Sequence, residues 1–367
     1  MALKTIFKDL RVIELANILA GPAVGMFFAE LGAQVLKIEN KTTEGDLTRQ
    51  WKLASEDPTS SVSAYYASVN LRKEIRMIDL GDPAEREEVY NLIRDADVVI
   101  SNFLPQVAER LGMTHQKFRQ LNPRIIVGSV TAYGEDDPRP GFDLVLQAES
   151  GFMSMNGTTL SGPLKMPVAL IDLLAAHQLK EGLLLALIQR QQSGVGCTVS
   201  VSLLDAAITS LANQASNYLT AGFIPGLSGS LHPNIAPYGE ILRSRDGKDI
   251  VLAVGNDKQF EALCKVLEIQ VIASDVRFSS NRLRIENRSV LGEYLATAAS
   301  AIDSGVLLDQ LSRSGVPSGM IKTIDEVFKD PHSQQLILEE KREGVLLRGV
   351  STLAFREMAG LSTENTD

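Results

Sequence analysis

Cysteine and histidine are scarce in this chain of 367 residues, which contains two cysteines and four histidines. Cys197 and Cys264 stand far apart and form no CxxC pair, which argues against a disulfide scaffold or a zinc site. We expect both to be buried thiols in a reducing compartment. No histidine has a second histidine four residues away, so we expect no metal site.

The chain also lacks an excess of positive charge and any long apolar run. Its formal net charge of −9 argues against general nucleic-acid binding, because neutralising phosphates requires a basic face. No stretch approaches the roughly 18 uninterrupted apolar residues of a membrane-spanning helix, and the N-terminal segment leads into a strand pattern without an apolar signal core. We therefore expect a cytoplasmic protein with no membrane partner.

Length and composition predict a folded protein with two domains. An apolar fraction of 44% and a charged fraction of 22% are typical of globular proteins. The chain is also longer than most domains with a single hydrophobic core. A stretch rich in Gly, Pro and Ser over 221–237 marks the crossing between domains. We predict a large domain over 1–220, a small domain over 221–323, and a C-terminal segment over 324–367 that returns to the large domain.

In the first half, short apolar runs alternate with helical patterns, as in a parallel sheet covered by helices. Strands are expected at 11–15, 34–39, 75–80, 97–101, 124–130 and 197–203, and helices at 23–31, 84–94, 142–155, 172–191 and 205–220. The smaller domain is expected to hold a strand at 250–254 and helices at 257–267, 290–299 and 305–312. The predicted fold class is α/β, with a Rossmann-like large domain and a smaller α/β domain. Ligands of such sheets bind beyond the carboxyl ends of the strands.

A single carboxylate lies inside a strongly apolar run. Asp172 has four apolar residues on each side, and an unpaired charge there would be costly. One interpretation is a helix N-cap, since Asp accepts hydrogen bonds from first-turn amides. The other is a nucleophile, because a carboxylate at a helix N-terminus in an apolar pocket would stay ionised and poorly hydrated. The two interpretations are compatible.

Other candidate residues follow the strand ends. Leu19-Ala20-Gly21-Pro22 lies after the first strand, but it is not GxGxxG, so dinucleotide binding is not predicted. Asn102, Phe103 and Arg110 follow the fourth strand and could accept an adenine ring and a phosphate, although the local pattern by itself favours a turn with a surface arginine. Three further basic residues are expected to be solvated: Arg72, Lys73 and Arg139.

Eight sequence segments follow one another along nearly the whole chain. They are RVIELANILAGP, LGAQVLKIE followed by GDLTR, SVNLRK, SNFLPQVAERLG, NPRIIVGSVTAYG, PGFDLVLQAESG, SGVGCTVSVSLLDA and HPNIAPYGEILRSRDGKDIVLAVGNDKQF. In this order and spacing they resemble the class III CoA-transferase family, which includes formyl-CoA transferase, carnitine CoA-transferases and methylacyl-CoA racemases.

The resemblance implies an interlocked homodimer that transfers CoA from an acyl-CoA donor to a carboxylic acid, with acyl-CoA as substrate and no permanently bound cofactor. Asp172 matches the family's nucleophilic aspartate, which would carry CoA as an aspartyl thioester while amides at the start of its helix steady the oxyanion. The family resemblance, and not this sequence itself, leads us to expect succinyl-CoA as donor and a small dicarboxylic or branched acid as acceptor. Specificity would come from loops such as 226–232 and 154–165.

The family's CoA contacts match ten positions of this chain: Leu19, Ala20, Asn40, Ile78, Asp79, Asn102, Phe103, Arg110, Arg139 and Phe142. The chain departs from some members at Asn40, where they carry Arg, and at Pro140, where they carry Lys. The resemblance therefore implies that phosphate binding rests on Arg110 and Arg139.

Two alternatives stay open. An acyl-CoA racemase needs an acid and a base on opposite sides of the α-carbon, and the family's racemases carry His-Asp where this chain has Phe142-Asp143. A carboxylate at Asp257, near a racemase acid position, keeps that alternative open. A non-catalytic CoA-binding protein would retain the fold without requiring Asp172.

Overall fold

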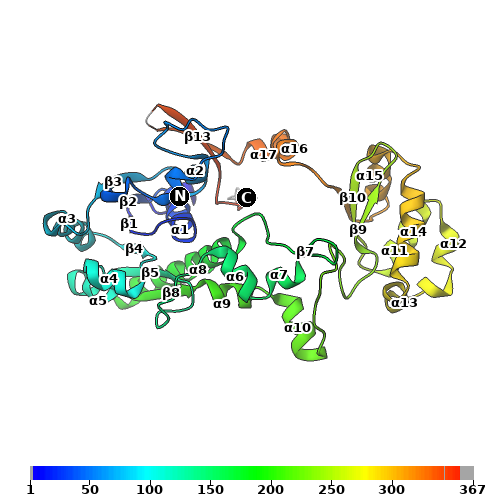
Figure 1. Cartoon of the computed structure of the whole chain (residues 1–367), viewed down its shortest axis with the longest axis horizontal. Helices are drawn as coiled ribbons and strands as arrows, with labels where there is room; N and C mark the ends of the chain where they lie inside the picture. The colour runs from blue at the N-terminus through cyan, green and yellow to red at the C-terminus, as the bar shows by residue number, and fades with distance from the viewer. Residues whose placement is uncertain (1–2, 343, 356–367) are drawn as a thin grey trace, which may run out of the picture. The chain divides into compact units, whose positions relative to one another are not determined.

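The computed structural model describes residues 3–342 and 344–355, and the chain divides into two compact units (Figure 1). Unit 1 runs to Met153, resumes over Lys165–Ser216 and again from Gln335, and unit 2 combines Ser154–Leu164 with Asn217–Gln334. Each unit therefore joins segments that are far apart in the sequence. None of the helices in the described part of the chain is long and apolar enough to cross a membrane.

Unit 1 is built on a six-stranded parallel sheet. Its strands are β1 (Arg11–Glu14), β2 (Gln34–Asn40), β3 (Glu74–Ile78), β4 (Val98–Ser101), β5 (Ile126–Thr131) and β8 (Thr198–Ser202). They lie in the order β3-β2-β1-β4-β5-β8, so the direction of winding reverses between β1 and β4. The expected α/β class with a central parallel sheet is confirmed. A sheet of this order binds ligands in the crevice beyond the strand ends at the reversal.

Helices bury both faces of this sheet. Val12 packs toward α1 (Ala20–Glu30) and α8 (Leu170–Ser193), whereas its neighbour Ile13 packs in the cluster that includes α3 (Pro83–Arg94) and α5 (His115–Leu121). Successive side chains of a strand point to opposite faces, so burial on both sides requires nearly continuous apolar strands. This explains the short apolar runs in the first half of the sequence.

Two expected helices are each divided in the structure. The segment 142–155 forms α6 (Asp143–Glu149) and α7 (Phe152–Met155), separated by Gly151 at φ 89°. The segment 205–220 forms α9 (Leu203–Thr209) and α10 (Ala212–Ala221), with Ala212 at φ 46°. A residue in the left-handed region cannot continue a right-handed helix, so both single-helix predictions were wrong. Helix α1 starts three residues earlier than expected, because Pro22 fits a first helical turn.

The C-terminal part of unit 1 is a hairpin of β12 (Ile337–Arg342) and β13 (Val345–Val350). It packs on α2 (Ala64–Asn70), and Leu347 joins Tyr66 in one buried cluster. Figure 1 shows the orange strand β13 beside the blue helix α2. The short helices α16 (Ile324–Phe328) and α17 (Pro331–Gln334) belong to unit 2, so the chain re-enters unit 1 just before β12.

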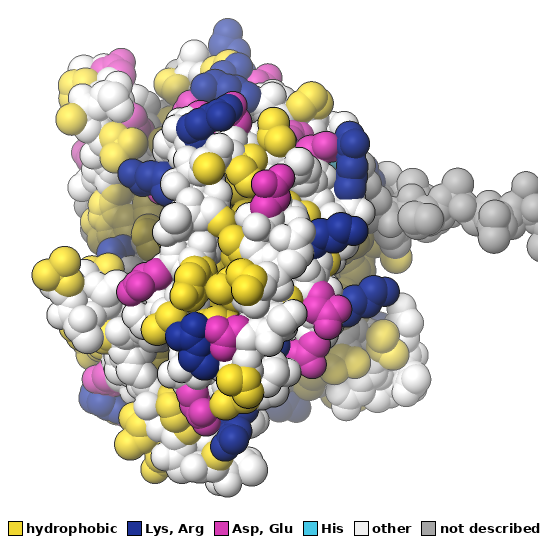
Figure 2. All heavy atoms as spheres, turned by 90° about the vertical axis from the view of Figure 1, so that its right-hand side faces the viewer, with side chains coloured by type: hydrophobic (Ala, Val, Ile, Leu, Met, Phe, Trp, Pro, Cys, Tyr) yellow, Lys and Arg dark blue, Asp and Glu magenta, His cyan; other side chains and the backbone are white. Residues whose placement is uncertain are grey.

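Unit 2 packs helices against a three-stranded antiparallel sheet in the order β11-β10-β9. The strands are β9 (Tyr238–Arg243), β10 (Asp249–Ala253) and β11 (Ser318–Met320), and the main helices are α11 (Asp257–Val266), α14 (Arg288–Ala299) and α15 (Ser304–Arg313). Their apolar faces form a separate core that includes Phe260, Cys264 and Leu295. On the face of the molecule drawn in Figure 2, acidic and basic side chains are interspersed with apolar ones, so neither sign of charge dominates there.

A buried charge network ties the ends of the first strands together. Lys37 Nζ lies 3.0 Å from Glu14 Oε1 and 3.0 Å from Asp46 Oδ2, and it donates to the Ala16 carbonyl at 2.6 Å. Lys73 Nζ lies 2.7 Å from the other oxygen of Glu14. The expectation that Lys73 is solvated was therefore wrong, since its side chain is 0% exposed and burial lowers its pKa to about 8.

We expect Glu14→Gln to destabilise unit 1 by roughly 3–5 kcal/mol, because Lys37 and Lys73 would remain buried without their shared carboxylate. The matched control is Glu87→Gln, which breaks an exposed ion pair with Arg94 and should change stability by less than about 1 kcal/mol. Urea unfolding followed by circular dichroism measures both. Equal unfolding midpoints for the two variants would contradict a structural role for the network.

Candidate active site

Two adjoining pockets lie beyond the carboxyl ends of the strands. The larger has a volume of about 420 Å³ and the smaller about 200 Å³, and both are lined by Asn17 and Phe103. Most residues identified from the sequence line one of these pockets. Those in the larger pocket are Asn40, Ile78, Asp79, Phe103 and Arg110. Those in the smaller pocket are Leu19, Ala20, Asn102, Phe103, Phe142 and Asp172. The fold thus gathers residues from five strand ends along one edge of the sheet.

Arg139 is the candidate that the structure leaves outside both pockets. Its guanidinium pairs with Asp137 at 2.7 Å and stacks over the Tyr133 ring at 3.8 Å from the centroid. Both contacts hold it on the rim, exposed to solvent as expected from the sequence.

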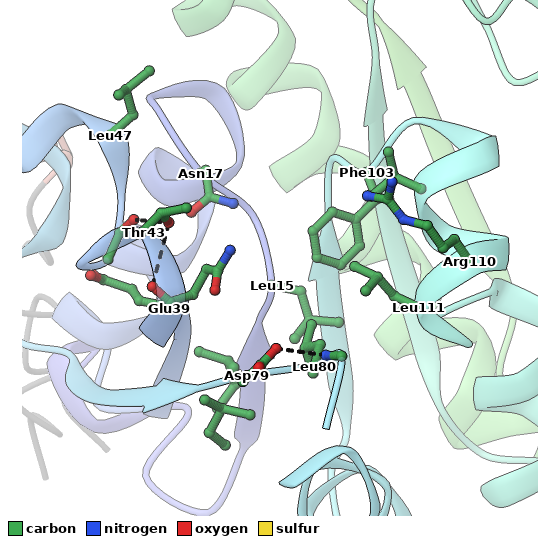
Figure 3. A pocket seen from close by; sticks show the side chains of 16 residues that line it. Leu15, Asn17, Glu39, Thr43, Leu47, Asp79, Leu80, Phe103, Arg110 and Leu111 are labelled. Atoms are coloured by element: carbon green, nitrogen blue, oxygen red, sulfur yellow. Dashed lines mark hydrogen bonds between the residues drawn. The ribbon is translucent and has the colours of Figure 1, made fainter. Parts of the chain in front are cut away.

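The larger pocket offers an apolar slot with a free cation beside it. Figure 3 shows Phe103 and Arg110 on one side of the opening, facing Asn17, Thr43 and Glu39 on the other. Arg110, on α4 (Pro105–Leu111), is exposed, and its guanidinium forms no ion pair or hydrogen bond with any described residue. An aromatic face next to an unpaired guanidinium suits a ligand with a flat ring and phosphates.

The loop after β1 is held by side chains from two other strand ends. Asn102 accepts a hydrogen bond from the Asn17 amide at 3.0 Å and donates to the Asn17 carbonyl at 2.9 Å. The next residue, Ile18, has φ 73°, which is strained for a β-branched side chain, and its amide donates to the Asp46 carboxylate at 3.2 Å. These contacts direct the start of α1 into the smaller pocket.

Gly21 in the first turn of α1 is needed for packing. A Cβ at this position would lie 2.3 Å from the Cβ of Ala16, closer than two non-bonded carbon atoms can approach. Only glycine lets α1 approach the end of β1 so closely. This agrees with the interpretation that the Leu19–Pro22 turn is a helix start and not a dinucleotide fingerprint.

Asp172 lies in the first turn of α8 but does not cap it. The helix begins at Leu170, so the N-cap interpretation was wrong. Asp143 of α6 binds the helix start in its place, and its Oδ1 accepts from the Ile171 amide at 2.7 Å and the Asp172 amide at 3.4 Å. These two amides are therefore already engaged, contrary to the expectation that they steady an oxyanion. The Asp172 carboxylate has no hydrogen-bond partner among the described residues, and it faces the smaller pocket.

The surroundings of Asp172 disfavour its charge. Burial, followed by the negative charge of Asp143, raises the pKa of Asp172 to about 7. The sequence led us to expect an ionised carboxylate, and burial together with Asp143 opposes that ionisation. No Lys, Arg or His is among the described residues that line the smaller pocket. The pocket thus holds a basic carboxylate without a cation to stabilise it.

Sequence reasoning missed two residues whose electrostatics are coupled to this carboxylate. Asp143 was noted only as the partner of Phe142 in a dipeptide, yet it binds the start of α8. Tyr65 of α2 packs against Trp51, with ring centroids 5.0 Å apart. Burial raises the pKa of Tyr65, and the charges of Asp172 and Asp143 add to the shift. No local pattern marks Tyr65, because its proximity arises from the packing of α2.

The two loops named for specificity contact each other within unit 2. Residues Gly157–Thr158 and Gly162–Pro163 form the short hairpin β6–β7. The Gly229 amide donates to the Gly157 carbonyl at 2.8 Å, and Ser228 pairs with Thr158. The segments 154–165 and 226–232 therefore meet although sixty residues separate them.

The two positions relevant to racemisation belong to different units of the chain, one in each. Phe142 is 54% exposed and lines the smaller pocket, and its ring has no proton to transfer. Asp257 in unit 2 forms an ion pair with Arg284 at 2.6 Å. A single titratable carboxylate, Asp172, faces the smaller pocket with no ion-pair partner among the described residues.

Comparisons with known proteins agree with this geometry. The chain is 38% identical over 352 residues to a succinate–glutarate CoA-transferase of Agrobacterium fabrum, an alignment that covers 94% of this chain and 87% of that protein. It is 31% identical to an acetyl-CoA:oxalate CoA-transferase of Acetobacter aceti, again over 94% of this chain and 87% of the relative.

The fold matches a solved structure over almost its full length. The crystal structure of a CaiB/BaiF family protein from Brucella suis superimposes with a TM-score of 0.82 at 35% identity, covering 96% of this chain and 93% of that one. A family model described as CoA-transferase family III matches residues 7–355. The chain therefore belongs to CoA-transferase family III, and it is a CoA-transferase.

Proposed function

We propose that the protein transfers CoA from succinyl-CoA to a small dicarboxylic acid through an aspartyl-CoA thioester on Asp172. The observation that carries this proposal is the Asp172 carboxylate, buried and without a cation, in a pocket that adjoins a larger slot. The named acids of the two curated relatives, glutarate and oxalate, are both dicarboxylic, which supports this class of acceptor.

In the proposed first half-reaction, the Asp172 carboxylate attacks the thioester carbonyl. The carbon–sulfur bond breaks, CoA thiolate leaves with the electron pair, and a mixed anhydride forms. The thiolate then attacks the aspartyl carbonyl, so the donor acid departs as a carboxylate and CoA remains on Asp172. The acceptor acid reverses these steps. Water must be excluded, and the burial of Asp172 supports that requirement.

We place the nucleotide part of CoA in the larger pocket and the thioester in the smaller one. Phe103 lines both pockets, which supports a single extended ligand. Arg110 is the unpaired cation of the larger pocket, whereas Arg139 is paired and lies outside, so we assign phosphate contact to Arg110. The remaining matched positions, from Leu19 to Phe142, would contact CoA through the surfaces that line these pockets.

We also propose that unit 1 is the CoA-binding domain, that unit 2 carries specificity loops, and that two chains interlock as a homodimer. Exposed apolar side chains of unit 1, namely Leu185, Ile188 and Val195, support contact with a second chain. The two cysteines are free thiols, which supports a reducing compartment such as the cytoplasm.

Asp172→Asn is expected to lower transferase activity by at least about a thousandfold, because an amide cannot form the anhydride. Mass spectrometry of new acyl-CoA species, after incubation with succinyl-CoA and a panel of dicarboxylic acids, measures activity and identifies the acceptor. Asp136→Asn is the matched control, since the Asp136 side chain is exposed and forms no ion pair or hydrogen bond with any described residue. Substantial activity in a folded Asp172→Asn protein would refute the nucleophile.

The value of kcat/KM for the acyl-CoA donor is expected to rise with pH and level off above about 7. The pKa of Asp172 is raised to about 7, so below that pH the carboxyl group is protonated and cannot attack. Activity should fall about tenfold for each pH unit below the midpoint. Steady-state kinetics from pH 5 to 9 measure this, and a flat profile across the interval would contradict the assignment.

Arg110→Ala is expected to raise the KM for the acyl-CoA donor about tenfold with little change in kcat, because a charge-assisted phosphate contact is lost at a distance from the thioester. Arg119→Ala is the control, since Arg119 on the neighbouring helix α5 is exposed and lies outside the pocket. Initial rates at varied donor concentration separate the two parameters. An unchanged KM would remove Arg110 from the CoA site.

A further inference from the structure

The carboxylate of Asp143 is held rigidly beside Asp172. Its Oδ1 accepts from the Ile171 amide at 2.7 Å, and its Oδ2 accepts from Gln147 Nε2 at 2.6 Å. Gln147 is fixed in turn, since its Oε1 accepts from the Met166 amide at 2.8 Å. All of these donors are neutral, and Asp143 forms no ion pair among the described residues. Its negative charge is therefore oriented but not neutralised.

The other groups around Asp172 do not supply a cation either. Asp137 lines the same pocket from the loop after β5 and is paired with Arg139 on the rim. Tyr65 approaches from α2, where burial, Asp172 and Asp143 all raise its pKa and keep the hydroxyl neutral. The first turn of α1 contributes only Leu19 and Ala20. The free enzyme thus holds two neighbouring carboxylates, and Asp143 repels the charge on Asp172.

We propose that Asp143 is a positioning residue that promotes acylation of Asp172, because its fixed charge repels the free carboxylate and this repulsion ends when Asp172 becomes a thioester. The inference rests on the proposed role of Asp172 as nucleophile. Asp143 holds the start of α8 by hydrogen bonds to its amides, so the Asp172 side chain remains free to react. One residue therefore orients the nucleophile and makes it more basic.

The charge balance of the reaction shows why this repulsion favours acylation of Asp172. Asp172 enters as a carboxylate and ends as a neutral thioester, while the donor leaves with the negative charge as its own carboxylate. Net charge therefore moves from a site beside Asp143 to an acid that diffuses away. A more basic carboxylate is also the stronger nucleophile. The repulsion thus favours both the attack and the covalent intermediate.

The test compares Asp143→Asn with Gln147→Leu. The first variant removes the charge and keeps an oxygen that accepts amide hydrogen bonds. The second removes the hydrogen bond to Oδ2 and keeps the charge. We expect Asp143→Asn to move the pH midpoint of kcat/KM to the acid side by about one unit. Gln147→Leu should not move it in that direction, whatever its effect on the rate.

A second readout is the fraction of chains that carry covalently bound CoA after mixing with succinyl-CoA, measured by intact-protein mass spectrometry. The ratio of CoA-bearing to free chains should fall about tenfold in Asp143→Asn, which corresponds to one pKa unit of lost repulsion. If circular dichroism shows that Asp143→Asn is unfolded, Asp143→Ser provides a smaller neutral acceptor for the same measurements.

The outcomes separate the two hypotheses. Transfer activity with an unchanged midpoint and unchanged covalent fraction in the neutral variants would overturn the role of Asp143 and leave Asp172 in place as nucleophile. An equal acid shift in Gln147→Leu would also overturn it, since hydrogen bonding and not charge would then be responsible. Activity without any covalent CoA in the wild-type protein would overturn the proposed function itself.

Discussion

The buried ammonium group of Lys37 connects the parts of unit 1 on which the site depends. It binds Glu14 from β1, Asp46 from the loop after β2, and the carbonyl of Ala16 beyond β1. Asp46 in turn accepts a hydrogen bond from the amide of Ile18, whose φ of 73° is strained for a β-branched residue. A chain segment with a left-handed, β-branched residue persists only where its surroundings over-determine it. The loop after β1, which lines both pockets, is therefore held in place by this ion cluster.

The distribution of buried charge differs between the scaffold and the site. In the scaffold, the buried carboxylates named here all have partners: Glu14 pairs with Lys37 and Lys73, and Glu39 pairs with Arg49 at 2.6 Å. Glu30 has hydrogen bonds from Ser351 and Thr352 instead of a cation. Such pairing satisfies groups that would otherwise destabilise the core. At the site, Asp172 has no cation and a second carboxylate nearby. Ionisable groups with perturbed pKa values are concentrated at functional sites, so this contrast supports the proposed role of Asp172.

The elements of the sheet could be predicted well from the sequence, and their interruptions could not. Apolar runs and their spacing identify the strands because a sheet buried on both faces requires them. The breaks at Gly151 and Ala212 depend on backbone angles that packing imposes. Apolar and helical periodicity continues across both positions, so a local pattern extends each helix too far. Lys73 was misplaced for a related reason, since its partner Glu14 lies fifty-nine residues earlier.

By itself, the sequence determined the fold class, the apolar setting of Asp172 and the strand ends from which site residues come, because these follow from periodicity and from side chains that are adjacent in the chain. Only the tertiary structure decided that Asp143 binds the start of α8 and repels Asp172, and that Arg110 is unpaired while Arg139 is not. It also decided that the charges of both carboxylates raise the pKa of Tyr65. These properties arise from distances and burial between segments far apart in sequence. The electrostatic environment of a carboxyl group is set by such neighbours, so the pKa of Asp172 could not be inferred from its position in the chain.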